Sequence, residues 1–161
     1  MSSPKTDRRL VAVLDNIRSL YNVGSMFRTA DALGIERLYL CGMTGTPADS
    51  LTQARISKTS LGAEDTVPWT HAATAAEAVA QLKADGFEVI ALEQTPAATP
   101  LPGFRPTSDT LAFVVGHELY GVHATALVAA DHHVTIPMLG SKESLNVAVA
   151  FGIAAAQLRF G

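Results

Sequence analysis

The sequence predicts an α/β protein whose mainly parallel sheet is flanked by helices. Short apolar runs, which are typical of buried strands, alternate along the chain with longer segments of helical periodicity. Chains in which strands and helices alternate in this way form parallel sheets. Hydrophobic residues make up 48% of the 161 residues and charged residues 17%, which is enough apolar material for one packed core. This length favours a single domain.

Two strands and three helices are predicted in the first half of the chain. The apolar run at 10–14 is the first strand, and a helix at 22–33 follows it, with an asparagine that can cap its start. Residues 38–41 form the second strand. A short helix at 51–62 and an alanine-rich helix at 74–84 both end at or shortly before a glycine.

The second half contains three further strands and a long apolar helix. Residues 87–92, 111–115 and 134–136 are the strands, and residues 94–106 form a loop because they hold four prolines. The helix at 144–160 is apolar on nearly every side. It must therefore be buried on several sides, either threaded through the fold or packed against a partner subunit.

Charge is distributed unevenly along the chain. The net charge of −3 excludes the strongly basic classes of nucleic-acid-binding protein. Residues 1–60 nevertheless hold eight Lys and Arg against five Asp and Glu, whereas residues 61–161 hold four against ten. A polyanion should therefore meet the first part of the chain. The basic residues concerned are Arg8, Arg9, Arg18, Arg28, Arg55 and Lys58.

The cysteine content and the apolar segments bear on the cellular compartment of the protein. Cys41 is the one cysteine, which excludes a disulfide framework and a Cys-based zinc site, and we expect it to be an unreactive core residue. Residues 1–10 are polar and basic and do not form a signal peptide. The apolar stretch at 145–160 is shorter than a bilayer span. The sequence therefore predicts a soluble, cytoplasmic protein.

Several common functional patterns are missing. The first strand is followed by Asp-Asn-Ile-Arg at 15–18 instead of a glycine-rich turn, and segment 116–121 lacks the Lys-Ser/Thr of a P-loop. Dinucleotide-binding domains, P-loop proteins and methyltransferases of the ordinary nucleotide-binding fold are thereby excluded, as is a flavodoxin-like domain. His132 and His133 are adjacent and point in different directions, so we expect solvated loop residues and no metal site.

Three polar segments follow predicted strands, where parallel sheets bind their ligands. They are Asn16-Ile-Arg-Ser-Leu-Tyr-Asn-Val-Gly-Ser-Met-Phe-Arg-Thr-Ala-Asp-Ala-Leu-Gly34, Phe113-Val-Val-Gly-His-Glu-Leu-Tyr-Gly121 and Ile136-Pro-Met-Leu-Gly-Ser-Lys-Glu-Ser-Leu-Asn-Val-Ala-Val-Ala150. Together they resemble the three motifs of the SpoU (TrmH-like) RNA ribose 2′-O-methyltransferases of the SPOUT superfamily. The resemblance runs from about Arg9 to the last residue and includes residues 58–64 and 67–69. One departure is His117, where relatives more often have Asn or Ser.

The resemblance implies a particular architecture and cofactor. It implies a deep trefoil knot formed by the C-terminal third of the chain, with S-adenosylmethionine bound in the knot. It also implies a homodimer whose active sites use both subunits. We expect residues 1–161 to be a single SPOUT methyltransferase domain without an appended RNA-binding domain.

The resemblance also assigns roles to individual residues. The catalytic set that it implies is Arg28, Asn22, Glu118, Ser144 and Asn146. The cofactor-binding set that it implies is Val115, Gly116, Glu118, Gly121, Ile136, Met138, Ser144 and Leu145. The residues expected to contact substrate RNA are Asn16, Arg18, Arg8 and Arg9.

Some of these residues also have purely structural interpretations. Asn22, Ser144 and Asn146 can each cap a helix, and Asn16 and Arg18 can simply form a turn. The family is often described as using the arginine at position 28 as a general base, although a guanidinium stays protonated in proteins. A phosphate-binding role is the alternative, and both remain open. Trp69 is expected to pack and not to stack on a base.

The sequence thus predicts an S-adenosylmethionine-dependent RNA methyltransferase that modifies a ribose 2′-hydroxyl. Transfer RNA is the expected substrate, because a minimal catalytic domain must find its target with little additional surface. An rRNA substrate is the alternative. A cofactor-binding or RNA-binding module without activity is a third possibility, against which the joint presence of the five catalytic residues argues.

Overall fold

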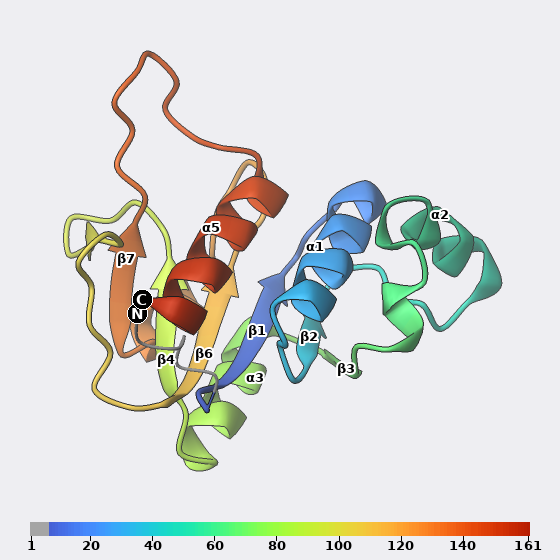
Figure 1. The fold of residues 1–161 in the computed structure, drawn as a ribbon, viewed down its shortest axis with the longest axis horizontal. Coiled ribbons are helices and arrows are strands. Elements are labelled where there is room, and N and C mark those ends of the chain that lie inside the picture. Colours follow the sequence, from blue (N-terminus) through green and yellow to red (C-terminus); the bar gives the residue numbers. More distant parts are fainter. Residues whose placement is uncertain (1–6) are drawn as a thin grey trace, which may run out of the picture.

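The computed structural model describes residues 7–161, so most of the polar segment preceding the first strand lies outside the described residues. Within them a parallel sheet of seven strands forms the centre of the molecule (Figure 1). The strands are β1 Arg9–Asp15, β2 Leu38–Cys41, β3 Trp69–Ala72, β4 Glu88–Leu92, β5 Thr99–Pro100, β6 Thr110–Val115 and β7 His132–Thr135. Their order is β3-β2-β1-β6-β4-β7-β5, with every neighbouring pair parallel. The predicted fold class is confirmed.

Helices cover both faces of this sheet. They are α1 Leu20–Ala32, α2 Ser50–Ser60, α3 Ala75–Ala84, α4 Ala124–Ala129 and α5 Val147–Phe160, with a 3₁₀ turn at Ala63–Asp65. The helices α1, α2 and α5 pack on one face, and α3 and α4 pack on the other. α1 and α5 lie side by side over the central strands (Figure 1). No helix within residues 7–161 is long and apolar enough to span a bilayer.

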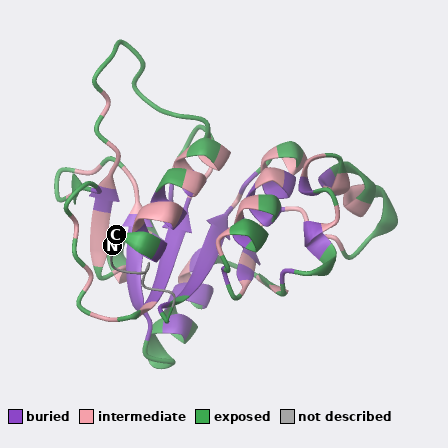
Figure 2. Cartoon of the chain, in the orientation of Figure 1, coloured by how far each residue is buried: buried purple, intermediate pink, exposed green. Residues whose placement is uncertain are grey.

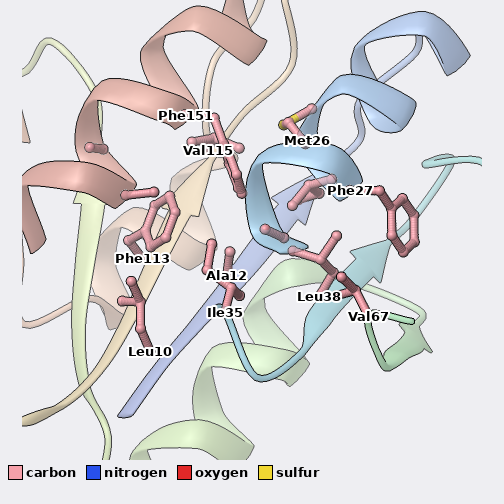
Figure 3. Close-up of a cluster of buried hydrophobic side chains, with 14 of the residues drawn as sticks. Leu10, Ala12, Met26, Phe27, Ile35, Leu38, Val67, Phe113, Val115 and Phe151 are labelled. Atoms are coloured by element: carbon pink, nitrogen blue, oxygen red, sulfur yellow. The ribbon is translucent and has the colours of Figure 1, made fainter. Parts of the chain in front are cut away.

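The central strands are buried on both faces, as Figure 2 shows. In β1, Leu10, Ala12 and Leu14 contribute to the core under α1 and α5, while Val11 and Val13 contribute to the core under α3. Alternate residues of a strand point to opposite faces, so a continuous apolar run indicates burial on both sides. Figure 3 shows the larger core, in which α1 and α5 bring Phe27 and Phe151 onto the sheet.

The structure corrects the prediction in several places. β3, β5 and α4 were not predicted, and α1 begins before Asn22, with Ser19 as its N-cap. His132 and His133 are strand residues, not solvated loop residues. His132 Nε2 lies 3.2 Å from Glu88 Oε1, and the His133 ring contacts Thr95 Oγ1 and the Leu127 carbonyl at 3.0 and 2.8 Å. Within the described part of the chain, no group of three His, Cys, Asp or Glu is placed to hold a metal.

Two arginines connect the beginning of β1 to the end of α5. The Arg8 guanidinium donates to the carbonyls of Leu158 and Gly161 at 2.7 and 3.3 Å. The Arg159 guanidinium donates to the carbonyls of Arg8, Leu33 and Gly34. Both side chains are buried, so these bonds satisfy donors that would otherwise be costly to bury.

The trefoil knot stays a prediction from the family.

Candidate functional site

A cavity of about 480 Å³ opens at the carboxyl ends of β4 and β6, beside the segment that leads from β7 into α5. All eight residues expected to bind the cofactor line it: Val115, Gly116, Glu118, Gly121, Ile136, Met138, Ser144 and Leu145. The cavity is also lined by residues that were not predicted: Leu92, which ends β4, and Glu93 and Gln94, which follow it. These three residues could have been predicted from the sequence, because the carboxyl end of the predicted strand at 87–92 lies at the same end of the sheet as the other strand ends around the cavity.

The loop at 117–121 forms one wall of this cavity and is a closed turn. His117 and Gly121 exchange two backbone hydrogen bonds of 3.0 and 2.9 Å. The His117 Nδ1 accepts from the backbone N–H groups of Leu119 and Tyr120, and its ring stacks on Tyr120 with centroids 4.8 Å apart. His117, the departure from the family pattern, therefore stabilises the turn through its Nδ1.

Gly116 and Gly121 are required by this turn itself. A Cβ at Gly116 would lie 2.1 Å from the Val122 nitrogen and 2.2 Å from the Gly121 carbonyl carbon. Gly121 has a φ of 70°, and a Cβ there would lie 1.9 Å from a Glu93 carboxylate oxygen. The resemblance assigns both glycines to the cofactor-binding set. The structure also requires them for the close packing of the turn against its own neighbours.

Three side chains predicted to be catalytic meet at the mouth of the cavity. The Asn22 amide donates to Glu118 Oε1 at 3.4 Å, and the Asn146 amide donates to Asn22 Oδ1 at 3.2 Å. Ser19 caps α1, which leaves the Asn22 side chain free for these contacts. Asn146 is also the N-cap of α5, because its Oδ1 accepts from the backbone N–H groups of Ala148 and Val149. We call Asn22, Glu118 and Asn146 the polar trio.

Glu118 is held as a carboxylate. Burial raises the pKa of this carboxyl, but backbone N–H donors from its own residue, Ser19 and Arg18, together with the Asn22 amide, lower it by more. The net effect is a Glu118 pKa below its usual range. At neutral pH Glu118 is therefore an ionised acceptor and a weak base, and it fixes the segment that leads into α1.

The remaining predicted catalytic residues differ in position. Ser144 lines the cavity but does not cap α5, which begins three residues later. Arg28 lies on the exposed face of α1 and does not line the cavity. A single chain therefore brings four of the five predicted catalytic residues to one place and leaves Arg28 outside it.

The residues expected to contact RNA are dispersed. Arg8 is buried and Arg9 pairs with Glu36 at 3.1 Å, both near the start of β1, at the edge of the sheet opposite the cavity. Asn16, with a φ of 55°, accepts from the Met43 N–H at 2.9 Å and so links the end of β1 to the loop after β2. The structure thus gives Arg8 and Asn16 structural roles. Arg18 is exposed next to the polar trio.

Two other expectations concern the core. Burial raises the pKa of the Cys41 thiol to about 12, which suits an unreactive core residue. Trp69 is half-buried on β3 and packs against the larger core cluster.

Comparison with known proteins identifies the family. The sequence matches the SpoU rRNA methylase family over residues 9–156. The chain belongs to this family. It is 31% identical over 152 residues to the 23S rRNA (guanosine-2′-O-)-methyltransferase RlmB of Neisseria meningitidis, covering 93% of this chain and 58% of that protein. A second RlmB, from Nitrosomonas europaea, is 34% identical, with 92% and 55% covered. The chain therefore spans little more than half the length of these curated relatives.

Solved structures agree with this assignment. The AdoMet-bound rRNA methyltransferase of Sinorhizobium meliloti superposes with a TM-score of 0.85 at 25% identity, covering 99% of this chain and 60% of that one. A structure reported for 2-OH methylation of C/U34 on tRNA superposes with a TM-score of 0.77 at 27% identity, covering 94% of both chains. Both structures share the fold over nearly the whole of the present chain.

Proposed function

We propose that this chain transfers a methyl group from S-adenosylmethionine to a ribose 2′-hydroxyl of RNA. One observation carries the proposal: residues of the second and third motifs enclose a single cavity, and the polar trio stands at its mouth. Membership of the SpoU family and the AdoMet-bound relative support the choice of cofactor. Both RlmB relatives, which are 2′-O-methyltransferases by name, support the choice of acceptor.

The cavity suits a nucleoside-sized ligand. Its volume of about 480 Å³ lies within the range of small-molecule sites. Apolar side chains from Ile136, Leu145 and Val115 alternate in its lining with polar groups from Thr135 and Gln94. Such a lining can hold an adenine ring and still hydrogen-bond a ribose. When bound there, S-adenosylmethionine supplies an electrophilic methyl group on a sulfonium.

The residues around the mouth position the acceptor. Asn22 and Asn146 present amide groups that can orient a ribose hydroxyl. Glu118 accepts from the Asn22 amide, and Asn22 in turn accepts from the Asn146 amide. Orientation of this kind lowers the barrier without any change of charge on the protein. The hydroxyl proton passes to a phosphate oxygen or to water as the 2′-oxygen gains the methyl group, because the oxygen becomes strongly acidic at that point and a weak base is enough to accept the proton. A guanidinium stays protonated in proteins and does not accept it. Arg28 binds the phosphate next to the reacting ribose.

Cofactor binding is the most direct test of the proposal. We expect S-adenosylmethionine and S-adenosylhomocysteine to bind the isolated protein, and NAD and ATP not to bind, when measured by titration calorimetry. Ala150→Phe places a ring in the cavity and should weaken cofactor binding about tenfold or more, since Ala150 lines it. Ala80→Phe, on the exposed side of α3, is the matched control and should leave binding unchanged. Folded protein that gives no heat with either sulfur nucleoside would contradict the proposal.

We infer that the substrate is tRNA. A structure reported for 2-OH methylation of C/U34 on tRNA superposes on this chain with a TM-score of 0.77 at 27% identity, and this likeness supports the inference. Mapping of 2′-O-methylation in tRNA and rRNA from a strain that lacks this gene tests the inference. Loss of one tRNA ribose methylation is expected, and loss of an rRNA methylation would establish the alternative supported by the RlmB relatives.

We also propose a homodimer that completes the site with Arg28. Val149, Ile153 and Phe160 are 51%, 42% and 50% exposed and form one stripe along α5. α1 lies beside this stripe, since a Cβ at Gly152 would come within 3.8 Å of Thr29 Cγ2. A second copy packed on the stripe would therefore be adjacent to Arg28, which a single chain leaves outside its own cavity.

The oligomeric state tests this assembly. Wild-type protein should sediment as a dimer, because burial of the apolar stripe stabilises association. The double variant V149D/I153D should sediment as a folded monomer with methyl transfer reduced at least a hundredfold. Val128→Asp, which changes an 86% exposed residue of α4, is the control and should leave the dimer intact. An active wild-type monomer would refute the proposed assembly.

A further inference from the structure

A second hollow lies on the other side of the segment that leads into α1. Its volume is about 390 Å³, and its lining consists of Arg18, Ser19, Leu20, Tyr21, Arg55 and Lys58. We call it the α1–α2 hollow. Arg55 and Lys58 are one turn apart on α2, and Arg18 faces them from the segment before α1.

The charges of the α1–α2 hollow are not neutralised by the protein. Within residues 7–161, none of the guanidinium or ammonium groups of Arg18, Arg55 and Lys58 forms an ion pair or a hydrogen bond with another residue. The nearby Glu64 carboxylate is buried and accepts from Ser60 and Gln53 instead. Three cations that share one hollow without a carboxylate repel one another. An anionic ligand removes that repulsion.

The walls of the hollow are fixed by close packing of α1 on α2. A Cβ at Gly24 would lie 2.0 Å from Thr59 Oγ1 and 2.3 Å from the Ile56 carbonyl oxygen, so the two helix backbones touch there. Thr59 Oγ1 also donates to the Tyr21 carbonyl at 2.8 Å. The cationic side chains therefore extend from a rigid base, which favours a defined ligand position.

The hollow adjoins the candidate active site. The backbone N–H groups of Arg18 and Ser19 both donate to the Glu118 carboxylate at 3.2 Å, and Glu118 lines the cavity. One short segment thus separates the two sites. An RNA strand that presents a ribose to the polar trio continues directly over this segment.

We propose that the α1–α2 hollow binds the RNA nucleotides next to the methylated one. Arg18, Arg55 and Lys58 contact the phosphates. Tyr21, which is 63% exposed, stacks on a base. The inference rests on the proposed function for its ligand, and it assigns recognition of the flanking strand to a surface formed by the start of the first motif and by α2.

The salt dependence of RNA binding tests the phosphate contacts. Each phosphate neutralised on a single strand contributes about −0.7 to the slope of log affinity against log salt, so three contacts contribute about −2. The full-length double variant R55Q/K58Q should bind bulk tRNA about tenfold more weakly at 0.1 M salt, with a slope shallower by about 1.4. The matched control K83Q/R105Q removes the same charge elsewhere and should change neither quantity.

Tyr21 variants test the stacking contact separately. Tyr21→Ala should weaken tRNA binding several-fold with the salt slope unchanged, because stacking releases no counterions. Tyr21→Phe keeps the ring and should restore wild-type affinity. If Tyr21→Ala has no effect, the base contact is refuted.

The remaining outcomes separate this inference from the proposed function. An unchanged salt slope in R55Q/K58Q overturns the phosphate contacts even if methyl transfer is demonstrated. Equal binding of polyglutamate and tRNA that is lost in the same variant also overturns the proposal, because the hollow would then bind any polyanion. S-adenosylmethionine affinity should be unchanged in every variant of the hollow. Failure of the wild-type protein to bind this cofactor contradicts only the proposed function.

Discussion

Arg28→Ala should reduce methyl transfer by a factor of at least 100, while the affinity for S-adenosylmethionine stays within about twofold of wild type. The reason is that Arg28 does not line the cavity, so cofactor contacts persist, whereas the proposed contact to the phosphate beside the reacting ribose is lost. Arg28→Lys should recover little activity, since an ammonium cannot reproduce the planar two-pronged contact of a guanidinium. Single-turnover transfer to tRNA and cofactor calorimetry on the same preparations provide the two measurements.

The matched control for this prediction is Arg105→Ala. Arg105 is an exposed arginine, and within residues 7–161 its guanidinium donates only to the carbonyl of the preceding residue, Phe104. Its replacement should leave both transfer and cofactor affinity unchanged. Retention of more than about a tenth of wild-type transfer by Arg28→Ala would show that the catalytic assignment is wrong.

Phe151→Ala should lower the free energy of unfolding by about 3–5 kcal/mol. Phe151 is fully buried on α5, and its ring lies 5.0 Å from that of Phe113 on β6 (Figure 3). Truncation removes this contact and leaves a cavity between α5 and the sheet. The loss is a large fraction of the about 5–15 kcal/mol that stabilises a typical domain. Urea denaturation monitored by circular dichroism measures it.

Val128→Ala provides the comparison for stability. Val128 is 86% exposed on α4, so its truncation should change the free energy of unfolding by about 0.5 kcal/mol or less. A cost below about 1 kcal/mol for Phe151→Ala would mean that α5 is not a structural part of the core.

The elements that the sequence predicted are those with a strong apolar signal. β1 and β6 are continuous apolar runs because both of their faces are buried, and such runs are visible without a structure. β3 was missed because it is an edge strand with two exposed residues, Thr70 and His71, and no apolar alternation. β5 is two residues long in a proline-rich loop, and its pairing with β7 is decided by tertiary contacts alone.

The candidate site, like the fold, was predicted only in part from the sequence. The motif resemblance predicted residues that the structure places around one cavity, but it did not predict how they are held. Ser19 and Asn22 are both good N-cap residues, and sequence alone could not show that Ser19 caps α1. That choice matters, because it frees the Asn22 side chain for Glu118. The burial of Arg8 was equally hidden, since its carbonyl partners lie about 150 residues away.

This pairing of Arg8 with the last turn of α5 has a consequence for biosynthesis. β1 is translated before the other strands, yet the Leu158 carbonyl that accepts from Arg8, the residue before β1, follows this arginine by 150 residues. At about 5–20 residues per second, β1 emerges from the ribosome roughly 8–30 s before that partner exists. Contacts this distant in sequence also form slowly, because closing the intervening loop is entropically unfavourable. Until that partner has been made, the nascent chain carries an apolar central strand that is not yet covered by α5, and water hydrates the Arg8 guanidinium in place of the Leu158 carbonyl.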